Sequence, residues 1–303
     1  MCNGNSPEGN LRQKYGMSPI WAPICEIYTE FFRICKKYGL RHYASGGTAL
    51  GAVRHHGFIP WDDDMDIMLP RPDYERFLKV APHEMPSYLK IVNRKNTPEF
   101  NYLFSKIQDC RREKVETIEK ELGRILPGGL FIDIYPMDGY PSGLCACYAR
   151  FKKTILDMIW HYRCGRFREY RIRGKIAWFA GMMLNLCTRK LRSNCDIMDE
   201  YENLIRENSY EKSKFVADIG CYRSVFVQPK MKRSFFSSQS SYRFENICIM
   251  LPGDATGYCI NKFGADYMKL PPESCRRTTH VGSSRSAWWL GPTNLKNADS
   301  LRA

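Results

Sequence analysis

The chain has 303 residues, 44% of them hydrophobic and 13% aromatic, and its 46 Lys and Arg outnumber its 32 Asp and Glu to give a formal net charge of +14. This content is ample for a packed core. The basic residues are spread along the sequence and form no basic arm, a distribution that is most often just a solvated surface. The charge is compatible with an anionic partner such as a nucleotide, a glycan or a membrane surface, and we expect no nucleic acid.

The 13 cysteines are scattered and include no CxxC pair, so neither a disulfide framework nor a zinc site is predicted. Reduced thiols are typical of a cytosolic protein. The first residues lack the basic and apolar segments of a signal peptide. We therefore expect a cytoplasmic location.

The first elements follow a loosely ordered stretch, residues 1–19. Apolar residues recur at helical spacing between Ile24 and Tyr38, and Gly39 suits the end of that helix. Residues 41–45 are predicted to form a strand that leads into the pair Gly46-Gly47. A glycine pair before a short helix leaves backbone N–H groups that can meet a phosphate.

The next stretch, DDDMDI at 62–67, alternates acidic and apolar residues in the manner of a half-buried strand. This alternation predicts that Asp62, Asp64 and Asp66 point to one face. Carboxylates gathered in this way repel one another, and Mg²⁺, which prefers oxygen ligands and also binds substrate phosphates, relieves the repulsion. The alternative is a solvated acidic turn. A calcium-binding loop is excluded because its required Gly and Glu are missing.

Pro70 ends this strand, and Pro72 begins a further helix. A charged amphipathic helix is predicted at 115–125, followed by a short apolar strand at 131–135 with Asp133 in its middle. Burying a lone carboxylate is costly. Asp133 is therefore either a cap or the partner of a local Arg or Lys, or it is a third carboxylate that faces Asp64 and Asp66. We favour the third carboxylate, because acids with perturbed pKa values cluster at functional sites.

The second half reads as mostly helical over 150–210, with strand-like pieces at 214–219, 223–227 and 242–251. Asp254 is expected to cap a helix that runs to Gly264. Within the helical part, the apolar segment 176–184 is too short to cross a bilayer. A buried helix is the favoured interpretation, and a helix in the membrane interface with its basic flanks on anionic lipid is the alternative.

Several of these stretches resemble one family. The long stretch 46–77, GGTALGAVRHHGFIPWDDDMDIMLPRPDYERF, resembles the signature of the LicD/fukutin family of phosphotransferases. Similar likeness is found at 102–109 (YLFSKIQD), 129–139 (GLFIDIYPMDG) and 263–272 (FGADYMKLPP). The resemblance extends from about residue 20 to about residue 280.

The resemblance implies an α+β fold, with a nucleotidyltransferase-type (polymerase-beta-like) mixed sheet core and an inserted or appended mostly helical region. It also implies transfer of a phosphorylated alcohol, above all phosphocholine, from a CDP-activated donor to a sugar hydroxyl of a cell-surface glycan or lipopolysaccharide. We accordingly expect four parts: the N-terminus 1–19, the catalytic core 20–145, a helical and mixed region on the acceptor side at 146–282, and a tail at 283–303.

For this reaction, Asp64, Asp66 and Asp133 are the predicted catalytic carboxylates. Asp64 and Asp66, with Asp62 as a weaker ligand, would hold Mg²⁺ or Mn²⁺. Asp133 would bind the metal or accept the proton of the acceptor hydroxyl. The predicted substrate-binding residues would contact phosphates or the leaving nucleotide, and they are Gly46, Gly47, Thr48, Arg54 and Lys106. A salt bridge to the acidic strand is the alternative for Arg54.

The predicted partners are the CDP-alcohol donor and the glycan acceptor, with peripheral contact at the inner membrane surface and no protein partner. Two other functions remain open. The same core could belong to a nucleotidyltransferase that moves a nucleoside monophosphate from an NTP to a small molecule or an RNA end. The chain could also be a catalytically inactive basic module that binds glycan or nucleic acid.

Overall fold

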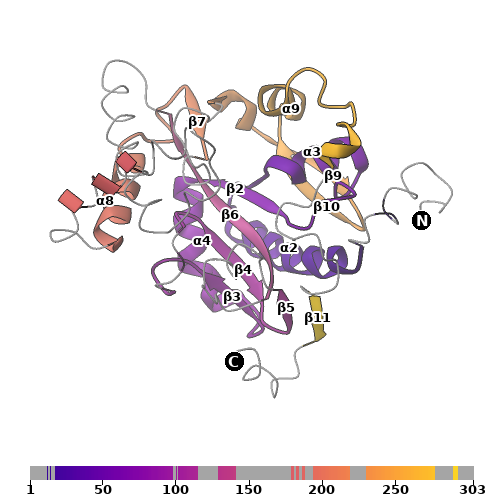
Figure 1. The fold of residues 1–303 in the computed structure, drawn as a ribbon, viewed down its shortest axis with the longest axis horizontal. Helices are drawn as coiled ribbons and strands as arrows, with labels where there is room; N and C mark the ends of the chain where they lie inside the picture. The colour runs from indigo at the N-terminus through magenta and orange to yellow at the C-terminus, as the bar shows by residue number, and fades with distance from the viewer. Residues whose placement is uncertain are drawn as a thin grey trace. The chain divides into compact units, whose positions relative to one another are not determined.

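The protein is described by a computed structural model for residues 12, 14, 18–97, 100, 102–114, 129–140, 179, 180, 182, 183, 186, 187, 194–218, 230–276 and 289–292. Figure 1 labels the helices and strands. By its internal contacts the chain forms two compact units. Unit 1 comprises residues 1–135 and 235–303, and unit 2 comprises residues 136–234.

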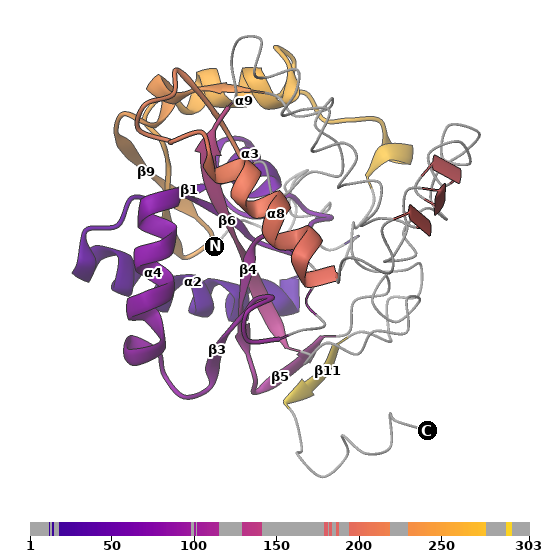
Figure 2. The ribbon, with the colours of Figure 1, turned by 90° about the vertical axis from the view of Figure 1, so that its left-hand side faces the viewer.

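Unit 1 begins with helix α2 (Ser18–Tyr38), which buries one apolar face and ends where Gly39 adopts a φ of +62° that glycine tolerates. Its Phe31 packs on Phe77 of α4 (Arg71–Glu84), with ring centroids 5.0 Å apart. Both helices also contact strands of the sheet, so they cover the same face of it (Figure 2).

The sheet of unit 1 has the strand order β1–β2–β6–β4–β3. Its strands are β1 (Tyr43–Ala44), β2 (Asp66–Pro70), β3 (Leu89–Val92), β4 (Ser105–Asp109) and the start of β6 (Leu130–Gly139). The pairs β1–β2, β3–β4 and β4–β6 are antiparallel. A separate short pair joins β5 (Arg112–Lys114) to β11 (Trp289–Pro292). This order places β2, which follows the acidic stretch, directly beside β6, which carries Asp133.

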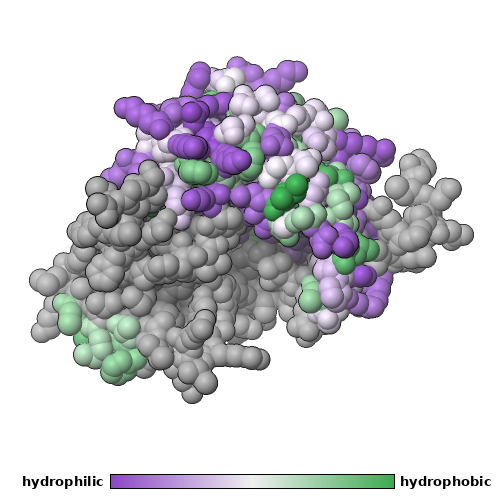
Figure 3. Space-filling model, turned by 90° about the horizontal axis from the view of Figure 1, so that it is seen from above, coloured by the Kyte–Doolittle hydropathy of each residue, from purple (hydrophilic) through white to green (hydrophobic). Residues whose placement is uncertain are grey.

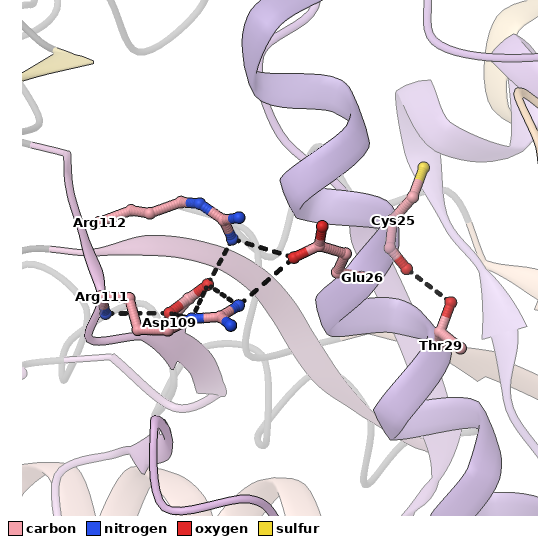
Figure 4. Close-up of polar contacts among 6 residues, drawn as sticks. All are labelled: Cys25, Glu26, Thr29, Asp109, Arg111 and Arg112. Carbon is pink, nitrogen blue, oxygen red and sulfur yellow. Dashed lines mark hydrogen bonds and ion pairs between the residues drawn. The ribbon is translucent and has the colours of Figure 1, made fainter. Parts of the chain in front are cut away.

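An ion-pair network ties the end of β4 to α2 (Figure 4). The fully buried Asp109 accepts hydrogen bonds from Arg111 Nη2 at 2.8 Å and Arg112 Nη1 at 2.6 Å. The same two guanidinium nitrogens reach Glu26 of α2 at 3.3 and 3.1 Å. Burial raises the pKa of Asp109, but the hydrogen bonds and charges of the two arginines outweigh it and hold that pKa below its usual value.

Helix α3 (Gly46–His55) connects β1 to β2. It packs against the hairpin of β9 (Gln239–Phe244) and β10 (Ile247–Pro252) through β9, and against α9 (Ala255–Phe263). Glu245, at the hairpin turn, accepts a hydrogen bond from the Phe58 amide at 3.0 Å and pairs with Arg12 at 2.9 Å. These contacts fix the loop that leads from α3 to the acidic stretch.

In unit 2, the end of β6 pairs with β7 (Phe215–Ala217), which pairs with β8 (Met231–Lys232). Helix α8 (Asn194–Arg206) buries Met198, Tyr201, Leu204 and Ile205. Two 3-10 turns complete the described elements, η4 (Arg233–Phe236) and η5 (Glu273–Cys275).

The mixed α+β class is confirmed, as are the first helix and the Asp254 cap, whose carboxylate accepts from the Gly257 amide at 2.8 Å. The strand-like piece predicted at 242–251 contains parts of two strands, because Glu245 adopts a φ of +53° and turns the chain into the β9–β10 hairpin. The predicted elements at 115–125 and 223–227, and the predicted boundaries at 145 and 282, lie outside the described residues. Among the described residues, no helix is both long and apolar enough to cross a membrane.

Candidate active site

The glycine pair forms the first turn of α3, and two hydrogen bonds tie that turn to β2. The Ser45 amide donates to the Asp66 carbonyl at 2.9 Å, and the Asp66 amide donates to Thr48 Oγ1 at 2.9 Å. Gly46 has a φ of +51°, in the left-handed region that disfavours a residue with a Cβ. The start of the helix and the end of the acidic stretch are therefore held at one place.

Three neighbouring carboxylates converge just before β2. One oxygen from each of Asp62, Asp63 and Asp64 lies within 4.8 Å of the other two. Asp63 is fully buried and Asp64 is 8% exposed. Burial first, and then the negative charges of Asp64, Asp63 and Asp66, raise the pKa of Asp62 well above its usual value. A cation would relieve this repulsion, so the cluster has the electrostatics of a cation site.

The way in which these residues gather differs from the prediction. Strand β2 begins only at Asp66, so strand alternation does not orient Asp62. Instead, the chain turns at 59–62, where the Asp62 amide donates to the Ile59 carbonyl at 2.8 Å, and Trp21 Nε1 donates to the Asp62 carbonyl at 3.0 Å. Because a turn and not a strand assembles the cluster, Asp63 joins it. Asp63 was not among the predicted site residues, since strand alternation directs it to the opposite face.

The two glycines allow these carboxylates to approach the start of α3. A Cβ added to Gly47 would lie 2.5 Å from Asp62 Oδ2, and one added to Gly46 would lie 3.3 Å from Asp66 Oδ2. The first-turn amides of a helix lack intrahelical acceptors and carry partial positive charge. The site therefore presents oxygen ligands for a cation beside amides suited to an anion, the two kinds of group that a metal-bound diphosphate needs.

The Gly46 amide has a partner inside the protein. It donates to the hydroxyl of Tyr258, on α9, at 2.9 Å, and the same hydroxyl lies 3.4 Å from Ser45 Oγ. Three residues of this turn were predicted to bind phosphate. The amide of Gly46 is directed to Tyr258, and the next two amides along the chain are those of Gly47 and Thr48. Tyr258 was expected only as part of a helix, because 212 residues separate it from Gly46 and no local pattern links the two.

Asp133 and Lys106 face each other in register across β6 and β4. Asp133 Oδ1 lies 3.1 Å from Lys106 Nζ, and Asp133 Oδ2 accepts from the Tyr135 hydroxyl at 3.1 Å. Both members of the pair are 4% exposed, and Lys106 Nζ also lies 3.3 Å from the ring centre of Phe131. The local lysine partner considered for Asp133 is thus present. The catalytic role of Asp133 and the nucleotide-binding role of Lys106 stay predictions.

Asp133 nevertheless lies beside the acidic stretch through its backbone, because its amide donates to the Met65 carbonyl at 2.9 Å.

Arg54 lies at the other end of α3 from the glycine pair. Its guanidinium donates to the carbonyls of Tyr267 at 2.9 Å and Lys269 at 3.2 Å, which anchors the segment after α9 on α3. Phosphate binding by Arg54 also stays a prediction.

Comparison with known proteins points to one family. Residues 39–123 match the family described as LicD/FKTN/FKRP, nucleotidyltransferase domain. The chain is 27% identical to the lipopolysaccharide cholinephosphotransferase LicD of Haemophilus influenzae over 85% of its own length and 94% of that protein. The chain therefore contains a LicD-type domain at residues 39–123. An uncharacterized protein of Rickettsia typhi shares 35% identity over only 20% of the chain.

The region that matches the LicD family domain contains the glycine turn, the whole acidic cluster, Arg54 and Lys106. Asp133 and Tyr258 lie beyond its end at residue 123. The likeness to the LicD protein of Haemophilus influenzae covers 85% of this chain, so it extends beyond residue 123 and includes Asp133.

Proposed function

We propose that this protein transfers a phosphorylated alcohol, phosphocholine, from a CDP-activated donor to a sugar hydroxyl of lipopolysaccharide or a related surface glycan. The observation that carries the proposal is the carboxylate cluster of Asp62, Asp63 and Asp64 at the start of α3, a place where a cation and a diphosphate can bind together. The name of the Haemophilus relative, a lipopolysaccharide cholinephosphotransferase, supports the choice of alcohol and acceptor.

The cluster fits Mg²⁺ or Mn²⁺ by its chemistry. Its donors are carboxylate oxygens within 4.8 Å of one another, and opposite ligands of an octahedral Mg²⁺ are about 4.2 Å apart. We propose Asp62 and Asp64 as ligands because their oxygens converge, with Asp63 as the third member of the cluster. The role of Asp66 as a ligand stays a prediction. When bound, the ion would neutralise charge on the donor's diphosphate.

The residues of the chain then have distinct tasks. The amides of Gly47 and Thr48 bind phosphate oxygens and align the donor, since phosphoryl transfer depends on positioning and charge neutralisation more than on covalent catalysis. Asp133 accepts the proton of the acceptor hydroxyl, or contributes a further ligand, and Lys106 steadies the leaving nucleotide. We also propose that the mixed sheet of unit 1 is of the nucleotidyltransferase type, which the match of residues 39–123 to the LicD/FKTN/FKRP nucleotidyltransferase domain supports.

A panel assay tests the proposal. Purified protein is incubated with lipopolysaccharide, Mg²⁺ and CDP-choline, CDP-ethanolamine or CDP-ribitol, and released CMP is measured. We expect release from CDP-choline that EDTA abolishes and that Asp64→Asn lowers at least 100-fold, while Asp266→Asn, which changes an exposed carboxylate after α9, leaves it unchanged. Release from no CDP-alcohol together with turnover of an NTP would support nucleotidyl transfer instead, and no turnover at all would support a binding module.

We further propose that the protein works at the cytoplasmic face of the membrane, in peripheral contact with it. Phe179, Met183 and Leu186 are 57%, 46% and 60% exposed, and their spacing places them on one side of a helix. Figure 3 shows the apolar patch that lies in this segment, at its lower left. The favoured interpretation of 176–184 as a buried helix does not hold for Phe179 and Met183. The flanking basic residues are Arg171, Arg173, Lys175, Arg189, Lys190 and Arg192.

Apolar side chains with basic flanks suit the interface of an anionic membrane. Sedimentation with vesicles of phosphatidylglycerol and phosphatidylcholine tests this location. We expect binding that a triple change to Ser at 179, 183 and 186 removes and that Ile260→Ser, at an exposed apolar residue of α9, retains. Equal binding of the triple variant and the wild type would contradict it.

A further inference from the structure

A tyrosine that is 212 residues away in the sequence accepts a hydrogen bond from the first amide of α3. Tyr258 is fully buried on α9, and its hydroxyl accepts the Gly46 amide at 2.9 Å. Ser45 Oγ, on the same turn, lies 3.4 Å from that hydroxyl. Ser45 is the N-cap residue of α3, yet its side chain makes no capping hydrogen bond, so it is Tyr258 and not the cap that satisfies the first donor of the helix.

The position of Tyr258 is itself fixed on two sides. Asp254 caps α9 through the Gly257 amide at 2.8 Å, which sets where this short helix begins. The Tyr258 ring meets Phe236 edge to face, with centroids 6.1 Å apart, and the Phe236 carbonyl accepts from the Tyr43 hydroxyl of β1 at 2.8 Å. The hydroxyl therefore has little freedom to move away from the glycine turn.

This hydrogen bond determines which amides of the turn remain for a ligand. With its φ of +51° and its amide directed to α9, Gly46 sets the direction in which the next amides leave the turn. Those next amides belong to Gly47 and Thr48, beside the Asp62 and Asp66 carboxylates. A rotation of the Gly46 peptide would change the angle between the amides and the carboxylate cluster.

We propose that Tyr258 is a positioning residue: by holding the Gly46 amide, it aligns the Gly47 and Thr48 amides with the carboxylate cluster. The alignment of a donor phosphate in this way rests on the proposed function. Tyr258 touches no reacting atom, so its removal should slow the aligned step and leave donor binding nearly intact. Misplacement by about 1 Å can cost on the order of 100-fold in rate.

The test compares two variants that each remove one buried hydroxyl. Tyr258→Phe removes the acceptor of the Gly46 amide. Tyr28→Phe is the matched control, because Tyr28 is also buried in unit 1 and its hydroxyl accepts a backbone amide, that of Met250 at 3.2 Å, away from the glycine turn. Both variants should lose similar thermal stability.

The readouts are the kcat and KM for CDP-choline and the exchange rate of the Gly46 amide. We expect Tyr258→Phe to lower kcat about 10-fold or more with KM within about 2-fold, and to speed Gly46 exchange, while Tyr28→Phe changes neither. Equal kcat values in the two variants, or unchanged Gly46 exchange, would overturn the inference. If Tyr258→Phe does not fold, Ser45→Ala, which removes the other contact of the hydroxyl, should lower kcat in the same direction, and no effect would count against the inference.

The outcome is separable from that of the proposed function. A wild-type protein that releases no CMP from CDP-choline would refute the proposed function. The exchange rate of the Gly46 amide in Tyr258→Phe would then decide whether Tyr258 holds the start of α3.

Discussion

Replacing Gly47 by Ala should separate the stability of α3 from the geometry of the carboxylate cluster. An alanine Cβ would lie 2.5 Å from Asp62 Oδ2, whereas ordinary contact begins at 3.4 Å, so the carboxylate must retreat by about 0.9 Å. A side chain can make this movement, and alanine in a helix is favoured over glycine by up to about 1 kcal/mol. We therefore expect the melting temperature of Gly47→Ala to be unchanged or raised.

The function should suffer in the same variant. Displacing one ligand of a shared cation by this distance should weaken Mg²⁺ activation on the order of 10-fold, or about 1.4 kcal/mol. The assay is CMP release against Mg²⁺ concentration, with thermal unfolding measured in parallel. A Gly47→Ala protein with wild-type Mg²⁺ dependence would refute the view that Asp62 binds the ion beside this glycine.

Gly51→Ala is the matched control on the same helix. Its Cβ would lie 2.4 Å from the Gly57 carbonyl oxygen, which belongs to the backbone and cannot move away cheaply. Overpacking of this kind costs about 1–3 kcal/mol. We expect a lower melting temperature and an unchanged Mg²⁺ requirement in the folded fraction, the opposite of the result for Gly47→Ala.

Three further predictions concern buried titratable residues. Asp109→Asn should lower the free energy of unfolding by about 1–3 kcal/mol at pH 7, because two arginines lose their charged partner. The pKa of Asp109 is lowered in the folded protein, so this difference between variant and wild type should shrink as the pH falls below 3.8. A difference that stays the same at low pH would argue against the network. Lys106→Met should lower the free energy of unfolding in urea by about 3–5 kcal/mol, because it leaves the buried Asp133 carboxylate without its lysine partner. Lys106→Met/Asp133→Leu should recover most of this loss, and equal stability of the single variant and the wild type would contradict the prediction. Burial lowers the pKa of His42 from 6.5 to about 4, so between these pH values the unfolded chain binds a proton that the folded protein does not. The free energy of unfolding of the wild type should therefore fall by about 3 kcal/mol from pH 6.5 to 4 relative to that of His42→Gln. Equal acid sensitivity of the two proteins would contradict this.

The sequence located the elements that carry the site but not the way their side chains meet. Helical periodicity and Gly39 predicted α2, and the glycine pair before a short helix predicted α3, because both depend on local spacing and backbone conformation. The acidic cluster was predicted as a group, but strand alternation assigned the wrong geometry to it. The turn at 59–62 depends on the long-range contact of Trp21 with Asp62, which no local pattern encodes.

Long-range partners were harder still to foresee. Asp133 stood out as a carboxylate in an apolar strand, yet the choice between a lysine partner and a catalytic role needs the register of β4 on β6. Tyr258 carried no signal, because an aromatic residue in a helix is ordinarily part of the core. Its hydroxyl reaches the Gly46 amide only because α9 packs on α3.

The position of a label in the product distinguishes phosphocholine transfer from nucleotidyl transfer. CDP-choline is labelled in the cytidine ring in one sample and in the choline in another, and each is incubated with Mg²⁺, lipopolysaccharide, and wild-type or Asp64→Asn protein. The account predicts that only the choline label enters lipopolysaccharide, and only with the wild-type protein. Cytidine label in the lipopolysaccharide, or choline transfer that persists in Asp64→Asn, would contradict it.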